Sequence, residues 1–262
     1  MLASTPALLE LQNIQVMRGT KVVLDDFNLR IESGEHVAIL GPNGCGKSTL
    51  IKTITRELYP VSRLGSKITI LGEESWNVFE LRSLLGIVSN DLMAWCTGEA
   101  VGRDVVLSGF FSSNDVYPNH LTTSEQIAKA EGALADLQVL HLADQPVGEM
   151  SSGEARRVLI ARALVHRPRA LLLDEPSNSL DLFARRALRE SMSQLATSGI
   201  GIVLVTHDLS DVIPEIERVV LMSKGRVIGD GSKVDILRSD RLSQAFGIEV
   251  ELARRNGHYY LW

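Results

Sequence analysis

Hydrophobic and polar residues alternate near the start of the chain, as they do in a half-buried β-strand. The alternation runs from Leu8 to Val16. The apolar side chains that share one face of this strand are Leu9, Leu11, Ile14 and Val16. Gly19-Thr20 predicts a turn, residues 22–24 and 28–31 predict a returning strand, and Ser33-Gly34 predicts a second turn. The pattern therefore predicts an antiparallel β layer at the start of the fold.

A buried strand, a glycine-rich loop and a helix follow in that order. The apolar run Val37–Leu40 predicts the strand, and Gly41–Ser48 fits G-x-x-x-x-G-K-[ST] at every fixed position. Apolar residues then recur at helical spacing, at Leu50, Ile51 and Ile54. This order is the context that a phosphate-binding loop needs. A plain glycine turn between strand and helix is therefore the weaker interpretation.

The residue types of this loop suit a nucleotide. Glycines keep side chains away from phosphate oxygens, while loop N–H groups and the helix N-terminus attract an anion. Lys47 can reach the β- and γ-phosphates, and the Ser48 hydroxyl can bind Mg²⁺. The residues expected to bind the nucleotide are Gly41, Pro42, Asn43, Gly44, Cys45, Gly46, Lys47, Ser48 and Thr49.

Strands and helices alternate through much of the remaining chain. Strands at 67–71 and 86–89 should flank a helix at 78–85. Strand-like runs are absent between residues 90 and 150, where helices are expected at 101–111 and 123–137, with Ser124 able to cap the second. The later elements are expected at 153–165 (helix), 170–173 (strand), 183–196 (helix), 201–206 (strand) and 218–222 (strand). The pattern predicts a mainly parallel sheet covered by helices, with an inserted helical lobe.

Two carboxylates end the expected strand at residues 170–173. Ligand sites of parallel sheets lie at the carboxyl ends of the strands, where Asp174 and Glu175 fall. Asp174 can hold Mg²⁺ through its water shell, and Glu175 can orient and deprotonate an attacking water. A polar strand end before a turn is the alternative, and the phosphate loop in the same chain makes it much weaker.

A second anion site is expected where the helix at about residue 153 begins. Met150-Ser-Ser-Gly-Glu154 opens this helix with small residues, and its first N–H groups have no partner within the helix. Ser151 adds a hydroxyl donor to these N–H groups. For this segment taken alone, a plain helix cap is the better interpretation.

Composition narrows the class of protein. The chain has 262 residues, and its net charge of −5 argues against a free-standing nucleic-acid binder. No apolar run approaches the length of a membrane span, the first residues do not resemble a signal peptide, and two cysteines make no disulfide framework. We expect a cytoplasmic location.

Five motifs in a fixed order resemble the ATP-binding cassette (ABC) ATPases, over about residues 8–247. The motifs are GPNGCGKST, SSGEARR, LLLDEP, Asn178-Ser-Leu-Asp181 and Val205-Thr-His207-Asp208. The resemblance implies one α/β domain over residues 1–262, a P-loop NTPase with a RecA-like core. This core and its antiparallel β layer would cover about 8–89 and 154–262, and an inserted helical subdomain about 90–153.

The resemblance also implies a mechanism. Two copies would form a head-to-tail dimer around two ATP molecules with Mg²⁺, and each ATP would touch Ser151 and Gly153 of the other copy. Asp181 resembles the residue that links the two sites, and His207 the switch histidine that senses the γ-phosphate. The residues implied to be catalytic are Glu175, His207 and Lys47, and those implied to bind the metal are Ser48, Asp174 and Asn90.

Some positions depart from the family pattern. Ser152 and Glu154 replace Gly and Gln of the usual Leu-Ser-Gly-Gly-Gln, and Glu154 adds a negative charge beside an anion site. Asn90 stands where the family usually has Gln. The aromatic that usually stacks on adenine is absent near Met17 and Arg18, which can cover the base or serve only in packing.

Two functions of different classes follow from these observations. The complete catalytic set in a short cassette predicts an ATPase subunit that is peripheral on the cytoplasmic face of a membrane and powers a separate transmembrane permease. The alternative is a soluble ATP-gated regulatory or repair module without a permease. The departures from the family pattern at Asn90, Ser152 and Glu154 favour this alternative. The transported substrate and its direction do not follow from the sequence.

Overall fold

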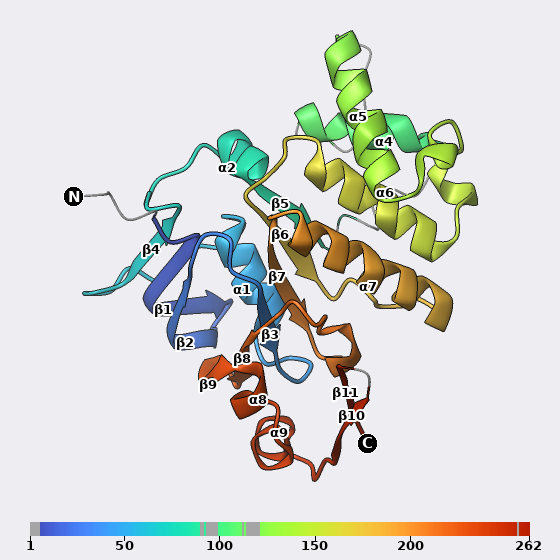
Figure 1. Ribbon diagram of the computed structural model, residues 1–262. Helices are drawn as coiled ribbons and strands as arrows, with labels where there is room; N and C mark the ends of the chain where they lie inside the picture. Colours follow the sequence, from blue (N-terminus) through green and yellow to red (C-terminus); the bar gives the residue numbers. More distant parts are fainter. Residues whose placement is uncertain (1–5, 90–91, 93–98, 112, 114–120, 256) are drawn as a thin grey trace, which may run out of the picture. The chain divides into compact units, whose positions relative to one another are not determined.

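The chain folds into two compact units that are interleaved in sequence. The computed structural model describes residues 6–89, 92, 99–111, 113, 121–255 and 257–262. The first unit comprises Met1–Val78 and Gly201–Trp262, and the second comprises Phe79–Ile200. Figure 1 shows the elements of each unit, coloured from blue at the N-terminus to red at the C-terminus.

An antiparallel β layer opens the first unit, as predicted. Strands β1 (Leu9–Arg18) and β2 (Lys21–Ile31) pair with each other, and β4 (Lys67–Ile70) pairs with the other edge of β1. The four predicted apolar positions of β1 are all buried. The expected turns at residues 19–20 and 33–34 are present. The returning strand is one continuous element, because Leu24, Phe27 and Leu29 keep a buried side in it.

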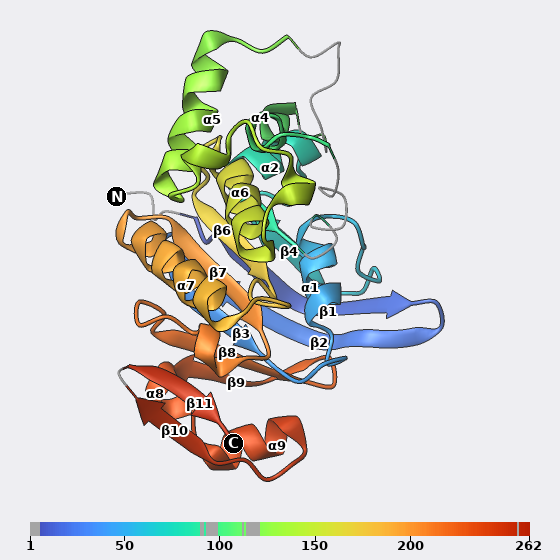
Figure 2. The same ribbon diagram turned by 90° about the vertical axis from the view of Figure 1, so that its right-hand side faces the viewer.

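Parallel strands lie at the centre of the same unit. β3 (Val37–Leu40) pairs in parallel with β7 (Gly201–Thr206) on one side and with β8 (Arg218–Ser223) on the other. All four residues of β3 are fully buried, as an apolar run between two neighbours requires. The helix predicted after the glycine loop is α1 (Lys47–Ile54), and it buries Leu50, Ile51 and Ile54. The strands stand side by side in Figure 2.

One strand of this unit, β9 (Arg226–Ser232), was not predicted from the sequence. It runs antiparallel to β8, and its residues alternate between exposed and half-buried. Its half-buried positions include Gly229 and Gly231. Because glycine has no apolar side chain, the sequence lacks the alternation of apolar and polar residues that predicts a strand.

The C-terminal segment completes the first unit. Two short helices, α8 (Lys233–Ile236) and α9 (Ser239–Phe246), precede the hairpin of β10 (Leu252–Arg255) and β11 (His258–Leu261). Asn256, which falls between these two strands, lies outside the described residues. β11 packs against the 3-10 helix Leu209–Asp211 that follows β7.

The second unit is mainly helical around two parallel strands. β5 (Leu85–Val88) pairs with β6 (Ala170–Asp174) in parallel register. The helices are α2 (Val78–Leu84, which begins at the boundary), α4 (Gly102–Leu107), α5 (Ser124–Asp136), α6 (Ser152–Leu164) and α7 (Leu182–Thr197). The buried stripe of α7 includes Leu188, Met192 and Leu195, as its spacing predicted.

Two predicted helices differ in detail from the observed ones. The helix expected at 101–111 is α4 followed by the 3-10 helix Ser108–Phe111. The prediction that Ser124 caps α5 is wrong, because Thr123 is the cap: its hydroxyl accepts the N–H of Gln126, whose side chain accepts the N–H of Thr123. Thr123 and Gln126 thus form a capping box, which the adjacent serine concealed.

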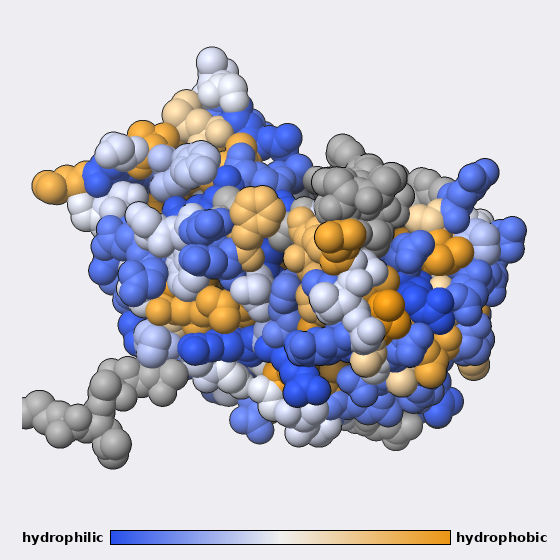
Figure 3. Space-filling view, turned by 90° about the horizontal axis from the view of Figure 1, so that it is seen from above, coloured by the Kyte–Doolittle hydropathy of each residue, from blue (hydrophilic) through white to orange (hydrophobic). Residues whose placement is uncertain are grey.

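Apolar side chains on the surface are interspersed with polar ones. Figure 3 shows small hydrophobic groups among hydrophilic residues on one face. Within the part of the chain that the structure describes, no helix has both the length and the hydropathy needed to cross a membrane.

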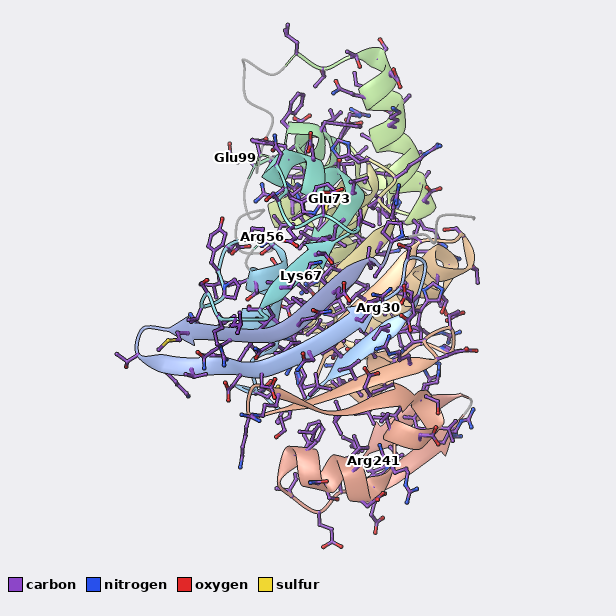
Figure 4. The ribbon with its side chains drawn as sticks, turned by 90° about the vertical axis from the view of Figure 1, so that its left-hand side faces the viewer. Arg30, Arg56, Lys67, Glu73, Glu99 and Arg241 are labelled. Carbon is purple, nitrogen blue, oxygen red and sulfur yellow. The ribbon has the colours of Figure 1, made fainter. Side chains whose placement is uncertain are left out.

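On the β layer, Arg30 pairs with Glu10 and Glu32, and Lys67 pairs with Glu74 (Figure 4). These ion pairs place charged side chains at the surface of this layer.

Candidate functional site

The glycine loop connects β3 to α1 in a conformation that favours an anion. Gly44 and Gly46 have positive φ angles of 78° and 114°, which only glycine adopts without strain. Gly46 is the N-cap of α1 and has no side chain to accept a hydrogen bond from the first turn. The start of α1 therefore has no side-chain cap at the position where a phosphate could accept hydrogen bonds.

Neighbouring strands hold the loop in place through close backbone contacts. A Cβ atom on Gly41 would lie 2.5 Å from the carbonyl oxygen of Met222 in β8 and 2.7 Å from the Cys45 sulfur. The N–H of Gly225, in the β8–β9 turn, donates to the carbonyl oxygen of Cys45 at 2.8 Å. Cys45 is only 4% exposed and packs inside the loop. The loop shape is therefore set by its surroundings as well as by its glycines.

Lys47 already lies along the loop. Its ammonium nitrogen donates to the carbonyl oxygens of Gly41 at 2.7 Å and of Pro42 at 3.2 Å, and the residue is 6% exposed. The ammonium group is thus held at the loop carbonyls, where phosphate oxygens can replace them as acceptors.

His207 lies beside the glycine loop in the first unit. The register of β3 and β7 places Leu40 next to Thr206, so the residues that follow these strands, Gly41 and His207, emerge side by side. His207 is half-buried at this edge. The first unit therefore brings the predicted loop residues and the predicted switch histidine together.

The second unit places the predicted carboxylates at the end of β6. Asp174 is 7% exposed and Glu175 is 8% exposed. Glu175 has a φ angle of 48°, a left-handed conformation that is strained for a residue with a side chain. Such strain is concentrated at functional sites, where it aims a side chain in a direction that regular structure does not allow.

Arg156 of α6 is a residue that the sequence analysis did not single out. It is 3% exposed, and burial lowers the pKa of its guanidinium while the negative charge of Asp174 acts in the opposite direction. A buried arginine charge therefore lies within electrostatic reach of Asp174. A charged residue at an inward position of a helix was the available signal.

Ser151 and Glu154 form a capping box at the start of α6. The Ser151 hydroxyl donates to the Glu154 carboxylate at 2.6 Å, and the Ser151 N–H donates to the same oxygen at 2.8 Å. The Ser151 oxygen in turn accepts the N–H of Glu154 at 3.4 Å. The hydrogen bond from the Ser151 side chain, followed by that from its backbone, lowers the pKa of Glu154, which keeps its carboxylate charged. The unusual glutamate thus has a local structural role.

The first residues of α6 touch the start of α7. Gly153 is buried, and a Cβ atom there would lie 2.6 Å from the Cβ of Ala184. Asp181 caps α7 by accepting the N–H of Ala184 at 2.8 Å. The second unit therefore brings Ser151, Gly153 and Asp181 to neighbouring helix ends. Asn90, the remaining predicted site residue, lies outside the described residues.

Gly153→Ala should lower the free energy of unfolding by about 1–3 kcal/mol, because the new methyl group overpacks the contact with Ala184. Gly132→Ala in α5 is the control, since a Cβ there meets nothing within 4 Å. This control should stabilise the protein by about 0.5–1 kcal/mol. Denaturant titration of both variants measures the difference, and equal stability of the two would refute the close contact of α6 and α7.

The surface expected to cover the nucleotide base includes Met17. Met17 and Val22 lie opposite each other across β1 and β2, and both are partly exposed, at 39% and 41%. The neighbouring residues Val23 and Leu24 contact the loop, because a Cβ on Gly46 would lie 3.3 Å and 2.9 Å from their atoms. An exposed apolar pair therefore lies next in sequence to residues that contact the glycine loop.

Comparisons with known proteins identify the family of this chain. The sequence model of the family described as "ABC transporter" matches residues 24–178. The cobalt import ATP-binding protein CbiO of Rhodobacter capsulatus is 37% identical over 227 residues, which cover 86% of this chain and 78% of that protein. The hemin import ATP-binding protein HmuV of Shewanella denitrificans is 34% identical over 255 residues, which cover 93% of this chain and 95% of that protein.

A solved structure shows the same fold. It is CbiO1 of Clostridium perfringens, described as part of the ABC transporter complex CbiONQ. The two structures superpose with a TM-score of 0.76 at 28% sequence identity, over 91% of this chain and 94% of that one. The P-loop α/β fold predicted from the motifs is thereby confirmed.

Proposed function

Because the chain belongs to the ABC transporter family, as an ATP-binding and ATP-hydrolysing subunit that powers a separate permease, we propose that two copies close head to tail around two Mg-ATP molecules. The observation that carries this proposal is the phosphate loop, with its open helix N-terminus and its inward-held lysine. The family membership supports the permease-linked function over the soluble regulatory alternative.

The phosphates would bind to the loop from Gly41 to Thr49. The N–H groups of the loop and of the first turn of α1 would donate to their oxygens. Lys47 would exchange its bonds with the Gly41 and Pro42 carbonyls for bonds with the β- and γ-phosphates, and its positive charge would offset phosphate repulsion. The base would rest on Met17 and Val22, an aliphatic surface in place of an aromatic one.

Mg²⁺ would take oxygen ligands from Ser48, Asp174 and Asn90. Serine and aspartate supply the hard oxygen atoms that this ion prefers. Among the described residues, no three His, Cys, Asp or Glu side chains gather into a group. Mg²⁺ commonly takes few protein ligands and leaves the rest to phosphates and water. Bound there, the ion would neutralise charge on the phosphates.

Glu175 would be the general base and His207 the sensor of the γ-phosphate. Glu175, held in its strained conformation, would accept a proton from the attacking water. His207, at the end of β7 beside the loop, would donate a hydrogen bond to the γ-phosphate. Both groups would thus act on charge that develops during hydrolysis.

The second copy would complete each ATP site. Ser151 and Gly153, at the N-terminus of α6, would approach the γ-phosphate bound to the other copy, and Asp181 would link the two sites. Glu154 would hold Ser151 in the capped conformation, and its charge would oppose closure. We also propose that residues of about 90–153 form a helical subdomain that faces the permease, with the chain peripheral on the cytoplasmic face of the membrane.

We propose the direction of transport but not the transported substrate. The relatives described above, CbiO and HmuV, are both named as import proteins, one for cobalt and the other for hemin. We therefore propose that the permease is an importer.

The dependence of turnover on protein concentration tests this function. If ATP hydrolysis needs two copies, the ATPase rate per chain should rise with protein concentration and level off once the dimer is saturated. The measurement is phosphate release at saturating Mg-ATP over a wide range of concentrations of the purified full chain. A rate per chain that stays constant down to concentrations at which the protein is monomeric would contradict the two-copy site.

A further inference from the structure

A buried carboxylate that the proposed chemistry does not use lies close to His207. Asp211 ends the 3-10 helix Leu209–Asp211 and is 0% exposed. Removing a carboxylate from water is costly, so a buried one is normally held by hydrogen bonds. Its position in the turn that follows β7 suggests a function connected with this turn.

Thr206 joins this carboxylate to the backbone beyond His207. The hydroxyl of Thr206 donates to Oδ2 of Asp211 at 3.1 Å and accepts the N–H of Asp208 at 3.0 Å. Thr206 is also 0% exposed, so both bonds are shielded from water. The hydroxyl therefore ties together the residues on both sides of His207.

Two more hydrogen bonds close the same turn. The N–H of Asp211 donates to the carbonyl oxygen of Asp208 at 3.2 Å, and the N–H of Ser210 donates to the Asp208 carboxylate at 2.9 Å. The 3-10 helix also packs against β11, whose Tyr259 is buried. The turn is thus held both from the core and from the C-terminal hairpin.

We propose that Thr206 and Asp211 are positioning residues that fix the backbone around His207 and so aim its imidazole at the γ-phosphate. This inference rests on the proposed role of His207. The parallel pairing of β7 with β3 fixes where this turn begins relative to the glycine loop, because Thr206 lies beside Leu40, the residue before the loop. A change in the turn therefore moves His207 relative to the loop.

The polar pair is better explained by positioning than by stability. A net gain from a buried hydrogen bond is modest, whereas a small displacement of a catalytic group lowers the rate strongly. A hydrogen-bonded hydroxyl and carboxylate also specify one geometry, which a nondirectional apolar contact does not. The Thr206–Asp211 hydrogen bond therefore serves to fix the conformation of the turn that contains His207.

Thr206→Val tests the positioning role because valine keeps the shape of threonine and removes its hydroxyl. We expect kcat to fall about 10- to 100-fold, with the Kd for ATP within about 2-fold of wild type, since the phosphate loop is unchanged. Thr206→Ser restores the hydroxyl and should return kcat to within about 3-fold of wild type. The measurements are steady-state ATPase activity, equilibrium titration with ATP, and thermal unfolding.

Thr69→Val is the matched control. The Thr69 hydroxyl also lies 3.4 Å from a carboxylate oxygen, that of Glu10, and Thr69 is likewise buried, but it belongs to β4 in the antiparallel layer. Its replacement should leave kcat unchanged. If Thr206→Val and Thr69→Val had equal kcat values, or if Thr206→Val weakened ATP binding as much as turnover, the positioning role would be overturned.

A double substitution separates this inference from the proposed role of His207. His207→Ala should lower kcat, and adding Thr206→Val to it should cause little further loss, because the group to be positioned is already gone. Additive losses would overturn the positioning role. Wild-type turnover in His207→Ala would instead refute the assignment of His207. A slow His207→Ala together with a fast Thr206→Val would leave that assignment intact and refute only the inference about Thr206 and Asp211.

Discussion

Lys47→Ala is expected to weaken ATP binding at least about 10- to 150-fold, the equivalent of one charge-assisted hydrogen bond of about 1.5–3 kcal/mol. This range is a lower bound, because the proposed site has Lys47 contact both the β- and the γ-phosphate. The backbone N–H groups of the loop would remain, but they carry only partial charges and cannot balance a triphosphate. Equilibrium titration of the purified variant with ATP measures the effect.

Lys233→Ala is the matched control for this prediction. The Lys233 ammonium also donates to two backbone carbonyls, those of Ile213 at 3.2 Å and Pro214 at 3.0 Å, but it lies at the start of α8, which carries no proposed nucleotide contact. Its removal should leave ATP affinity within about 2-fold of wild type. Equal affinity of Lys47→Ala and Lys233→Ala would remove Lys47 from the nucleotide site.

Glu175→Gln is expected to lower kcat by about 10²- to 10⁴-fold, the usual contribution of a general base. Glutamine has nearly the same shape as glutamate, but its amide cannot accept the proton of water. ATP affinity should change little, because the phosphate loop is intact. Single-turnover hydrolysis and ATP titration separate the two effects.

Glu190→Gln serves as the control for loss of a carboxylate in the same unit. Glu190 is exposed on α7 and pairs with Arg186. Its replacement should leave the rate unchanged, since an exposed ion pair contributes little. Turnover of Glu175→Gln equal to that of Glu190→Gln would exclude Glu175 as the base.

Much of the fold could be predicted because its signals are local. The apolar run of β3, the alternation of β1 and the glycine loop each lie within a short segment, and the structure places these elements at the predicted residues. The stripe of Leu188, Met192 and Leu195 on α7 is equally local and is buried as expected.

Other features depend on contacts between distant segments and left little trace in the sequence. β9 was missed since its half-buried positions include glycines, and pairing with β8 defines it as a strand. The close approach of Gly153 to Ala184 involves two helices separated in sequence. Local competition explains the wrong cap at α5, because Thr123 and Ser124 are both good caps and only Thr123 has the extended backbone that a cap requires.

The candidate site shows the same division. The motifs singled out Lys47, Asp174, Glu175 and His207 as candidates from residue order. They did not reveal that Arg156 is buried near Asp174 or that Asp211 bonds to Thr206. These contacts join charged or polar residues across helices and turns, where no periodic pattern marks them. Assignments that rest on pairing in space therefore required the structure.

The central claim, that two copies of the chain enclose ATP, is tested most directly by the mass of Glu175→Gln in solution. Light scattering after size-exclusion chromatography should give the mass of one chain without nucleotide and of two chains with Mg-ATP, because the variant binds ATP but cannot hydrolyse it and reopen. Adding Lys47→Ala to the same protein should return the mass to that of one chain. If Glu175→Gln remained a monomer at saturating Mg-ATP, the shared two-copy site would be contradicted.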